Sequence, residues 1–180
     1  GVTPRRVVDG RIAQAIAGAT TWVLIGGPPC QAYSLVGRSR MRPKNPEKFE
    51  RDHRHFLYKE YLRILATHRP TAFVMENVKG LLSSRVGGEL IVHRILGDLS
   101  ALDYRLFSLE DGLEWDGDIK SAKSFLVHAE RHGVPQARHR VIIVGIDKNS
   151  FHRSPGTLAR RPGATVREAI GDLPRKPSTL

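Results

Sequence analysis

The sequence predicts an α/β fold with a mostly parallel sheet. Three short runs rich in β-branched and other apolar residues support this prediction, at residues 22–25, 72–75 and 141–144. Segments with helical spacing of apolar residues separate these runs. Strands that alternate with helices favour parallel pairing through right-handed crossovers. In such a sheet ligands bind beyond the carboxyl ends of the strands, so polar residues near those ends are candidates for function.

The first half of the chain is expected to supply two strands and one helix. Residues 22–25 form the first strand, which stops at the loop Gly26-Gly27-Pro28-Pro29. A polar and strongly basic loop follows over residues 37–55. Apolar spacing then predicts a helix over residues 56–68, which leads into the second strand at 72–75.

The second half is expected to add a helix over about residues 89–102 and a strand over 104–109. Residues 110–118 contain five acidic side chains and no basic one, which is typical of a surface insertion. The last strand has the strongest β pattern in the chain and is expected to end at Gly145. Beyond it the sequence is rich in Arg, Pro and Gly, with one short helical segment around residues 166–170.

Composition narrows the class of protein. A chain of 180 residues with 40% apolar and 26% charged residues is one folded domain's worth. No apolar run reaches the roughly 18 residues that a membrane span needs. The first residues lack the apolar stretch of a secretory signal, so a cytoplasmic location is expected. The net charge of +11 suits a polyanionic partner such as nucleic acid, but it suits a solvated basic surface about equally well.

Cys30 is the single cysteine, which excludes an internal disulfide framework and a cysteine-rich zinc site. It follows two glycines and two prolines, so the backbone can be approached closely and the loop is stiff. A nucleophilic thiol needs partial exposure and positive neighbours, which the basic loop could supply. A lone cysteine is more often a small buried apolar residue, but this loop position favours function.

Two other groups of polar residues lie beside predicted strands. Glu76 and Asn77 follow the second strand, where a carboxylate is a candidate proton donor and the amide could orient it. Gln136, Arg138 and Arg140 precede the last strand, and paired arginines can hold a phosphate, a carboxylate or a base carbonyl. An ordinary polar strand end would explain either group taken singly. The three nearby histidines form no recognisable metal set in sequence, so no metal is expected: His128, His132 and His139.

Three motifs, GGPPCQAYS, ENVKGLL and GVPQARHR, occur in this order and resemble signature motifs of the DNA cytosine-5 methyltransferase family. Each motif is modest by itself, but three in order at suitable spacing are specific. The similarity runs from about residue 19 to residue 146, and TVREAIGDLP also resembles family members. The resemblance implies a partial Rossmann-like methyltransferase domain, S-adenosyl-L-methionine as methyl donor and double-stranded DNA as partner.

The resemblance also implies roles for individual residues. Cys30 corresponds to the nucleophile that adds to C6 of a flipped cytosine, and Glu76 to the acid at N3. Arg140 corresponds to the arginine at O2, and Arg138 supports the loop or the carboxylate. The remaining positions match the family's substrate-binding residues, Gln31, Ser34, Asn77 and Gln136, and its cofactor-binding residues, Pro29 and Leu57.

The chain departs from the family pattern at both ends. No Phe-x-Gly-x-Gly segment precedes Cys30, and no target-recognition region follows the last motif. We therefore expect residues 1–150 to be part of a catalytic domain and residues 151–180 to lead toward a target-recognition domain. The chain is expected to be the middle of a larger enzyme or half of a split enzyme, and to be inactive by itself.

Other functions remain open at this point. A non-catalytic DNA-binding or regulatory relative would not need Cys30, Glu76 and Arg140 together. Methylation of cytosine in tRNA, by the family's RNA-directed branch, uses the same chemistry and is not separated by these motifs. A thiol hydrolase would need a histidine partner in a matching motif, and none is evident.

Overall fold

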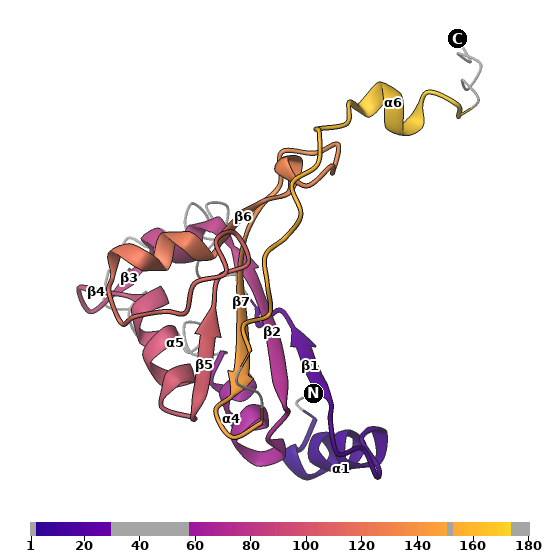
Figure 1. Ribbon diagram of the computed structural model, residues 1–180. Helices are drawn as coiled ribbons and strands as arrows, with labels where there is room; N and C mark the ends of the chain where they lie inside the picture. The colour runs from indigo at the N-terminus through magenta and orange to yellow at the C-terminus, as the bar shows by residue number, and fades with distance from the viewer. Residues whose placement is uncertain (1–2, 30–57, 151–152, 174–180) are drawn as a thin grey trace, which may run out of the picture.

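The structure is a computed structural model, and it describes residues 3–29, 58–150 and 153–173. The predicted helices and strands occur in the predicted order, and the structure adds an N-terminal helix, α1, and a short strand, β6, that the sequence analysis did not predict (Figure 1). They are α1 (Arg5–Ala15), β1 (Val23–Gly26), α4 (Tyr58–His68), β2 (Ala72–Val78), α5 (Ile91–Ser100), β5 (Tyr104–Phe107), β6 (Leu126–His128), β7 (His139–Asp147) and α6 (Val166–Ile170). Short elements complete them: the 3₁₀ turns η2 (Lys79–Ser83), η3 (Lys120–Phe125) and η4 (Ala129–Arg131), and the hairpin strands β3 (Arg85–Val86) and β4 (Glu89–Leu90).

The central sheet has the order β1-β2-β7-β5, and β6 also pairs with β7. Strands β1 and β2 are parallel, whereas β7 is antiparallel to β2, β5 and β6. The other four strands therefore share one direction and only β7 opposes them. The sheet is mostly parallel in direction, as predicted. The expected chain of parallel neighbours holds only for β1 and β2, because β7 inserts between β2 and β5.

Two predicted strand ends differ from the structure. β2 continues through Glu76 and Asn77 to Val78, so these polar residues belong to the strand instead of following it. β7 continues through Gly145 to Asp147. A Cβ at Gly145 would lie 2.0 Å from the ring of Phe73. This glycine therefore makes room for an aromatic ring in the core, and the expectation that it ends the strand is wrong.

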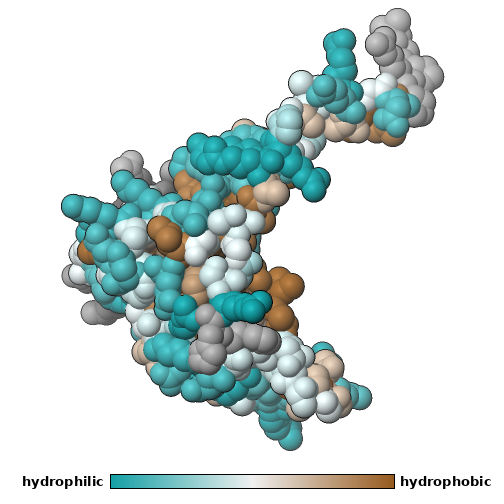
Figure 2. Space-filling view, viewed as in Figure 1, coloured by the Kyte–Doolittle hydropathy of each residue, from teal (hydrophilic) through white to brown (hydrophobic). Residues whose placement is uncertain are grey.

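The two faces of the sheet are covered unequally. Helices α4 and α5 pack on one face through buried residues such as Leu65, Ile95 and Leu99, which belong to the same hydrophobic cluster as Phe73 of β2. The opposite face carries a smaller cluster of Phe107, Val144 and Ile146. On β1, Val23 is 52% exposed and Ile25 is 76% exposed, so this edge of the second face is open. Figure 2 shows hydrophobic surface on the side where β1 lies.

The acidic segment 110–118 is tied to the sheet more closely than a surface insertion would be. Glu114 forms an isolated bridge with Phe107 and pairs with Arg105, whose Nη2 lies 2.8 Å from its carboxylate. The carboxylate of Glu110 accepts the backbone N–H of His128. The five acidic residues therefore include side chains that fasten this segment to β5 and β6.

The C-terminal residues extend away from the sheet (Figure 1). Backbone hydrogen bonds tie Leu158 to Leu109 and Arg161 to Arg131 before the chain departs. Helix α6 is capped by a reciprocal Thr165–Glu168 capping box but buries none of its residues. Within the described part of the chain, no helix is both long and apolar enough to span a membrane. The division at residue 150 stays a prediction.

Candidate functional site

Glu76 and Arg140 meet across the β2–β7 pair. Arg140 lies opposite Val78, and Glu76 lies opposite Ile142, so the two side chains are diagonal neighbours on one face. The Nε atom of Arg140 is 2.7 Å from Oε1 of Glu76. The contact is an ion pair and not an aligned hydrogen bond, because the Nε–H of Arg140 does not point at an acceptor among the described residues. Nη1 of the same guanidinium donates to the carbonyl of His139 at 2.8 Å. The Glu76 side chain is 44% exposed and that of Arg140 25%, so a ligand can reach both.

The loop after β1 lies directly beside this pair. A Cβ added to Gly27 would be 3.1 Å from Oε2 of Glu76, so the missing side chain lets the carboxylate approach the loop. Asn77 is 2% exposed and faces the other side of β2. Its Nδ2 donates to the carbonyl of Pro28 at 3.3 Å, and its Oδ1 accepts the N–H of Val78 at 2.9 Å. The amide thus fixes the glycine–proline loop against the strand that carries Glu76.

Helix α4 supports the same corner through Tyr61. Its hydroxyl group lies 3.2 Å from the carbonyl of Val74 and 3.4 Å from that of Leu24, and so joins the helix to both parallel strands. Burial raises the pKa of the Tyr61 phenol well above its usual value, so the phenol stays a hydrogen-bond donor. A Cβ at Gly26 would be 2.8 Å from the Tyr61 ring. The two glycines therefore have different uses: Gly26 admits the tyrosine and Gly27 admits Glu76.

The other predicted residues are less closely gathered. Arg138 precedes β7, is exposed, and makes no side-chain hydrogen bond or ion pair with any described residue, unlike Arg140. Its backbone carbonyl accepts the N–H of Ala129, and its N–H donates to the carbonyl of Gln136. The Gln136 side chain is also exposed. Gln136 and Arg138 therefore precede the last strand as predicted, whereas Arg140 lies within it.

Several predicted residues cannot be placed relative to the pair. Cys30, Gln31, Ser34 and Leu57 lie outside the described residues, as does the basic loop at 37–55. Pro29, the last described residue before Cys30, is exposed beyond the carboxyl end of β1. The thiol of Cys30 follows directly in the chain from the loop that Asn77 holds.

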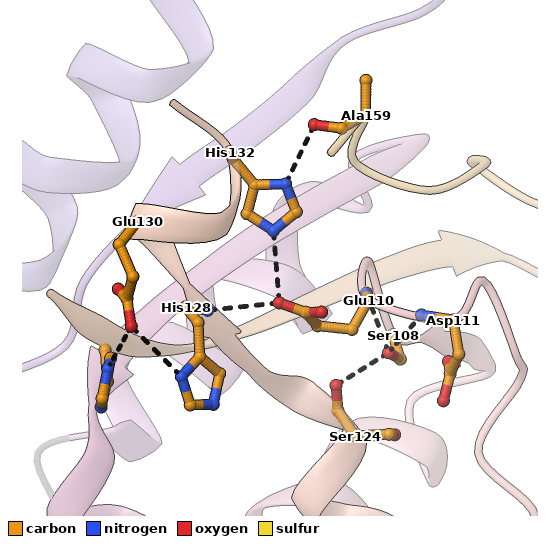
Figure 3. A network of polar contacts seen from close by, with 9 residues as sticks. Ser108, Glu110, Asp111, Ser124, His128, Glu130, His132 and Ala159 are labelled. Atoms are coloured by element: carbon orange, nitrogen blue, oxygen red, sulfur yellow. Dashed lines mark hydrogen bonds and ion pairs between the residues drawn. The ribbon is translucent and has the colours of Figure 1, made fainter. Parts of the chain in front are cut away.

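A second polar cluster lies at the junction of β6 and β7 and was missed by sequence reasoning (Figure 3). His128 and His139 are directly opposite in the strand register, and Glu130 of η4 contacts both. Beside them, His132 contacts Glu110 at 3.3 Å and the carbonyl of Ala159 at 3.1 Å. Sequence spacing gave no signal, because the pairing of β6 with β7 and the segment 129–138 that connects them bring these residues together.

Comparisons with known proteins identify the chain's relatives. The family described as C-5 cytosine-specific DNA methylase matches residues 8–179. The chain is 36% identical over 156 residues to the type II methyltransferase M.Bpa9945I of Bacillus paralicheniformis, covering 84% of this chain and 32% of that protein. It is 33% identical over 154 residues to the DNA (cytosine-5-)-methyltransferase M.ApeKI of Aeropyrum pernix, covering 81% and 31%. The type II methyltransferase M.AquIA of Picosynechococcus is 32% identical over 169 residues, with 84% and 60% covered.

A solved structure supports the fold. A crystal structure described as a DNA modification methyltransferase encoded within an E. coli prophage matches 96% of this chain and 40% of its own, with a TM-score of 0.61 at 22% identity. The chain spans about a third of the length of the first curated relatives that it matches. The match over residues 8–179 and the identity to these enzymes lead to one conclusion: the chain belongs to the C-5 cytosine-specific DNA methylase family.

Proposed function

We propose that this chain supplies the catalytic centre of a DNA cytosine-5 methyltransferase that uses S-adenosyl-L-methionine and a covalent Cys30 intermediate. One observation carries the proposal. Glu76 and Arg140 are paired at 2.7 Å beside the Gly27–Pro28 loop, and that loop leads directly to Cys30. An acid and a cation thus lie together at one corner of the sheet, and the residue that carries the thiol follows Pro29 directly in the sequence.

The chemistry explains why these three groups are needed. Cytosine is a poor electrophile at C6 and a poor nucleophile at C5, so a covalent nucleophile and acid assistance are both required. The Cys30 thiolate forms a bond to C6 while Glu76 supplies a proton or hydrogen bond at N3. The electron pair released to C5 makes that carbon nucleophilic, and a bound methyl donor would supply the methyl group there and keep the electrons of its own sulfur–methyl bond. Loss of the C5 proton then restores the double bond and expels the Cys30 thiolate.

The Glu76–Arg140 pair matches the edge of cytosine that this reaction must activate. N3 and O2 are adjacent acceptors on the ring, and the exocyclic amine beside N3 is a donor. A protonated Glu76 can donate to N3 with one oxygen and accept from the amine with the other. The Arg140 guanidinium can donate to O2. In the free protein each side chain instead pairs with the other, so the base replaces an existing partner for both.

We assign Asn77 a positioning role. Both polar atoms of its buried amide bond to backbone groups, of Pro28 and Val78, which leaves it poorly placed to contact substrate. Gln136 and Arg138 are exposed in the loop before β7, where they remain proposed contacts to substrate or to the loop. We also propose Gln31 and Ser34 as contacts near the DNA backbone, as the family resemblance implies.

The cofactor and DNA assignments rest on the family and on position. S-adenosyl-L-methionine, when bound, supplies an electrophilic methyl group. Exposed Pro29 lies beyond the end of β1, where open α/β sheets bind their ligands, so it is compatible with one wall of such a site. Leu57 is proposed for the same wall. A duplex must release its cytosine into the pocket, and the basic residues of the chain can bind the phosphates of the distorted DNA.

A mechanism-based trap tests the proposal. In the enzyme that contains this chain, a DNA duplex with 5-fluorocytosine at the target should form a stable covalent adduct, because fluorine at C5 cannot leave as a proton. Cys30→Ser should form no adduct while keeping its circular dichroism spectrum. An adduct of equal yield in Cys30→Ser would overturn the assignment.

The same trap separates the two nucleic-acid substrates. Parallel reactions with a duplex and with tRNA, each carrying 5-fluorocytosine, should give adduct with the duplex. Adduct with tRNA only would keep the Cys30 chemistry and reject DNA as substrate.

A further inference from the structure

The cluster at the β6–β7 junction has the composition of a metal site. His128, Glu130 and His139 each offer one ligand atom, and these three atoms lie within 4.8 Å of one another. Oε1 of Glu130 is 2.8 Å from Nε2 of His139 and 3.6 Å from Nδ1 of His128. Tetrahedral zinc with ordinary bond lengths needs ligand atoms about 3.4 Å apart. Small side-chain rotations would bring these atoms to that spacing.

Strand register positions the two imidazoles. His128 and His139 are directly paired across β6 and β7, so their side chains project from the same face, with ring centroids 4.2 Å apart. Two rings held that close, with a carboxylate reaching both, form a convergent set before any ion enters. Such prior arrangement lowers the entropic cost of binding.

The contacts within the protein leave this set incompletely satisfied. Oε2 of Glu130 is buried and has no hydrogen-bond partner among the described residues. An unsatisfied buried carboxylate oxygen is costly, and a water ligand on an ion bound at Oε1 could donate a hydrogen bond to it.

We propose that His128, Glu130 and His139 form a binding site for a zinc-class divalent ion, with water as the fourth ligand. Two imidazoles and one carboxylate are a ligand set that zinc accepts, and two histidines make a hard-cation site for magnesium or calcium the less suitable alternative. The site joins the end of β6 to the start of β7, and so closes the loop of residues 129–138 at its base.

The proposed metal site lies on the face of β7 opposite to the Glu76–Arg140 pair. Successive residues of a strand point to opposite faces, so His139 and Arg140 lie on opposite sides of β7. A bound ion would fix the strand position that presents Arg140 and the loop that carries Gln136 and Arg138, without entering the space between Arg140 and Glu76. Metal binding at this site can therefore be tested independently of the proposed methyl transfer.

Binding can be measured directly with zinc and cobalt ions. The enzyme that contains this chain is purified without a polyhistidine tag, treated with a chelator and titrated with each ion by calorimetry. We expect the parent enzyme and its Cys30→Ser variant each to bind one ion at this cluster, with the same affinity. Cobalt should give the visible absorption of a four-coordinate ion with nitrogen and oxygen ligands, which a purely structural salt bridge cannot produce.

Substitutions then locate the ion. His139→Ala and the near-isosteric Glu130→Gln should each weaken binding by more than about tenfold. His132→Ala is the matched control, because His132 belongs to the same loop and contacts a carboxylate, Glu110, outside the cluster. It should keep both affinity and cobalt spectrum. Circular dichroism confirms that each variant is folded, and Glu130→Gln provides the test if His139→Ala is not.

Four results would overturn the proposal. The first three are the absence of zinc binding by the folded parent, unchanged binding and cobalt absorption in Glu130→Gln and His139→Ala, and equal loss in His132→Ala. Loss of binding in Cys30→Ser would also reject it, because the ion would then be held by the thiol.

Discussion

Glu76 and Arg140 hold one another in the free protein, and this mutual pairing shapes what each residue can do. The carboxylate is kept beside the Gly27 backbone and the guanidinium is directed across β2, although both side chains remain reachable from solvent. A substrate base must separate the pair. The two residues are therefore preorganised for neighbouring positions of one ring, which is the condition under which fixed polar groups contribute most to catalysis.

Replacing Glu76 by glutamine should slow the chemical step far more than it weakens DNA binding. Glutamine keeps the shape of the side chain but cannot donate an acidic proton, and general acid catalysis is typically worth about 10²–10⁴-fold in rate. Single-turnover methylation measures the step. Glu89→Gln is the control. Glu89 lies on β4 of the β3–β4 hairpin, and its exposed carboxylate pairs with Arg94 of α5. A Glu76→Gln rate within about threefold of the parent would remove Glu76 from the chemistry.

Sequence reasoning found these residues but not their contact. The motif spacing pointed to Glu76 and Arg140 as candidates, because a polar residue beside an apolar run can be recognised from the sequence alone. The contact between the two side chains depends on the register of β2 against β7. Sixty residues separate these strands in the sequence, so the register cannot be deduced from the motifs. The metal cluster was missed for the same reason, since cross-strand pairing of His128 with His139 leaves no sequence period.

At the scale of elements, β7 and the loop that precedes it organise the site. β7 pairs with three strands and presents Arg140 on one face and His139 on the other. At Gly145 it passes directly beside the ring of Phe73 in the core. The sequence predicted that β7 exists, because Val141–Val144 is strongly apolar. It misplaced the end of the strand, because a glycine that stops a strand and one that admits a neighbouring ring look alike in sequence.

Gly145→Ala should destabilise the protein strongly. The new Cβ would lie 2.0 Å from the Phe73 ring in a packed core, so the ring or strand must shift, at a cost of about 1–3 kcal/mol or more. Gly97→Ala is the matched control: nothing lies within 4 Å of its Cβ position on α5, and alanine should stabilise the helix by about 0.5–1 kcal/mol. Urea unfolding measures both. Equal midpoints for the two variants would contradict the packing argument.

The Glu110 contacts should make stability depend on pH. Burial acts to raise the pKa of the Glu110 carboxyl, but the N–H of His128 and the ring of His132 outweigh it and hold the pKa below its ordinary value. A group with a lowered pKa in the folded state adds stability above its unfolded pKa of about 4.3, and that stability is lost as pH falls through the folded pKa.

Glu110→Gln should therefore be less stable than the parent by about 1–2 kcal/mol at pH 7, and the difference should shrink toward pH 3. Chemical denaturation at several pH values provides the measurement. Asp103→Asn is the control, because the Asp103 side chain is 67% exposed and its carboxylate lies 3.8 Å from Nζ of Lys148. A difference for Glu110→Gln that stays constant with pH would assign its effect to shape instead of charge.

At the scale of the whole molecule, one face of the sheet is closed by helices and the other is open at β1. Val23 and Ile25 expose 52% and 76% of their surface on β1, which is the outermost of the described strands at this side of the sheet. Exposed apolar strand edges favour pairing with another chain. The 180-residue chain should therefore self-associate as its concentration rises.

Sedimentation velocity at several concentrations tests this expectation. Ile25→Lys should shift the population toward monomer, because a charge at the edge opposes strand pairing. Leu113→Lys is the control, since Leu113 is 65% exposed but lies away from β1, in the acidic segment after β5. If the parent chain and the Ile25→Lys variant were both monomeric at every concentration, β1 would not mediate self-association.

The insertion of β7 between β2 and β5 has a consequence for how the chain emerges during synthesis. β2 and β5 leave the ribosome well before residues 139–147, yet neither pairs with the other in the final sheet. Until β7 arrives, each has an unsatisfied edge, and any direct union of the two would have to be undone. Among the described strands of the central sheet, only β1 and β2 can pair correctly beforehand. The nascent chain must therefore keep β2 and β5 apart until β7 is made, which lengthens the interval in which it depends on protection from premature association.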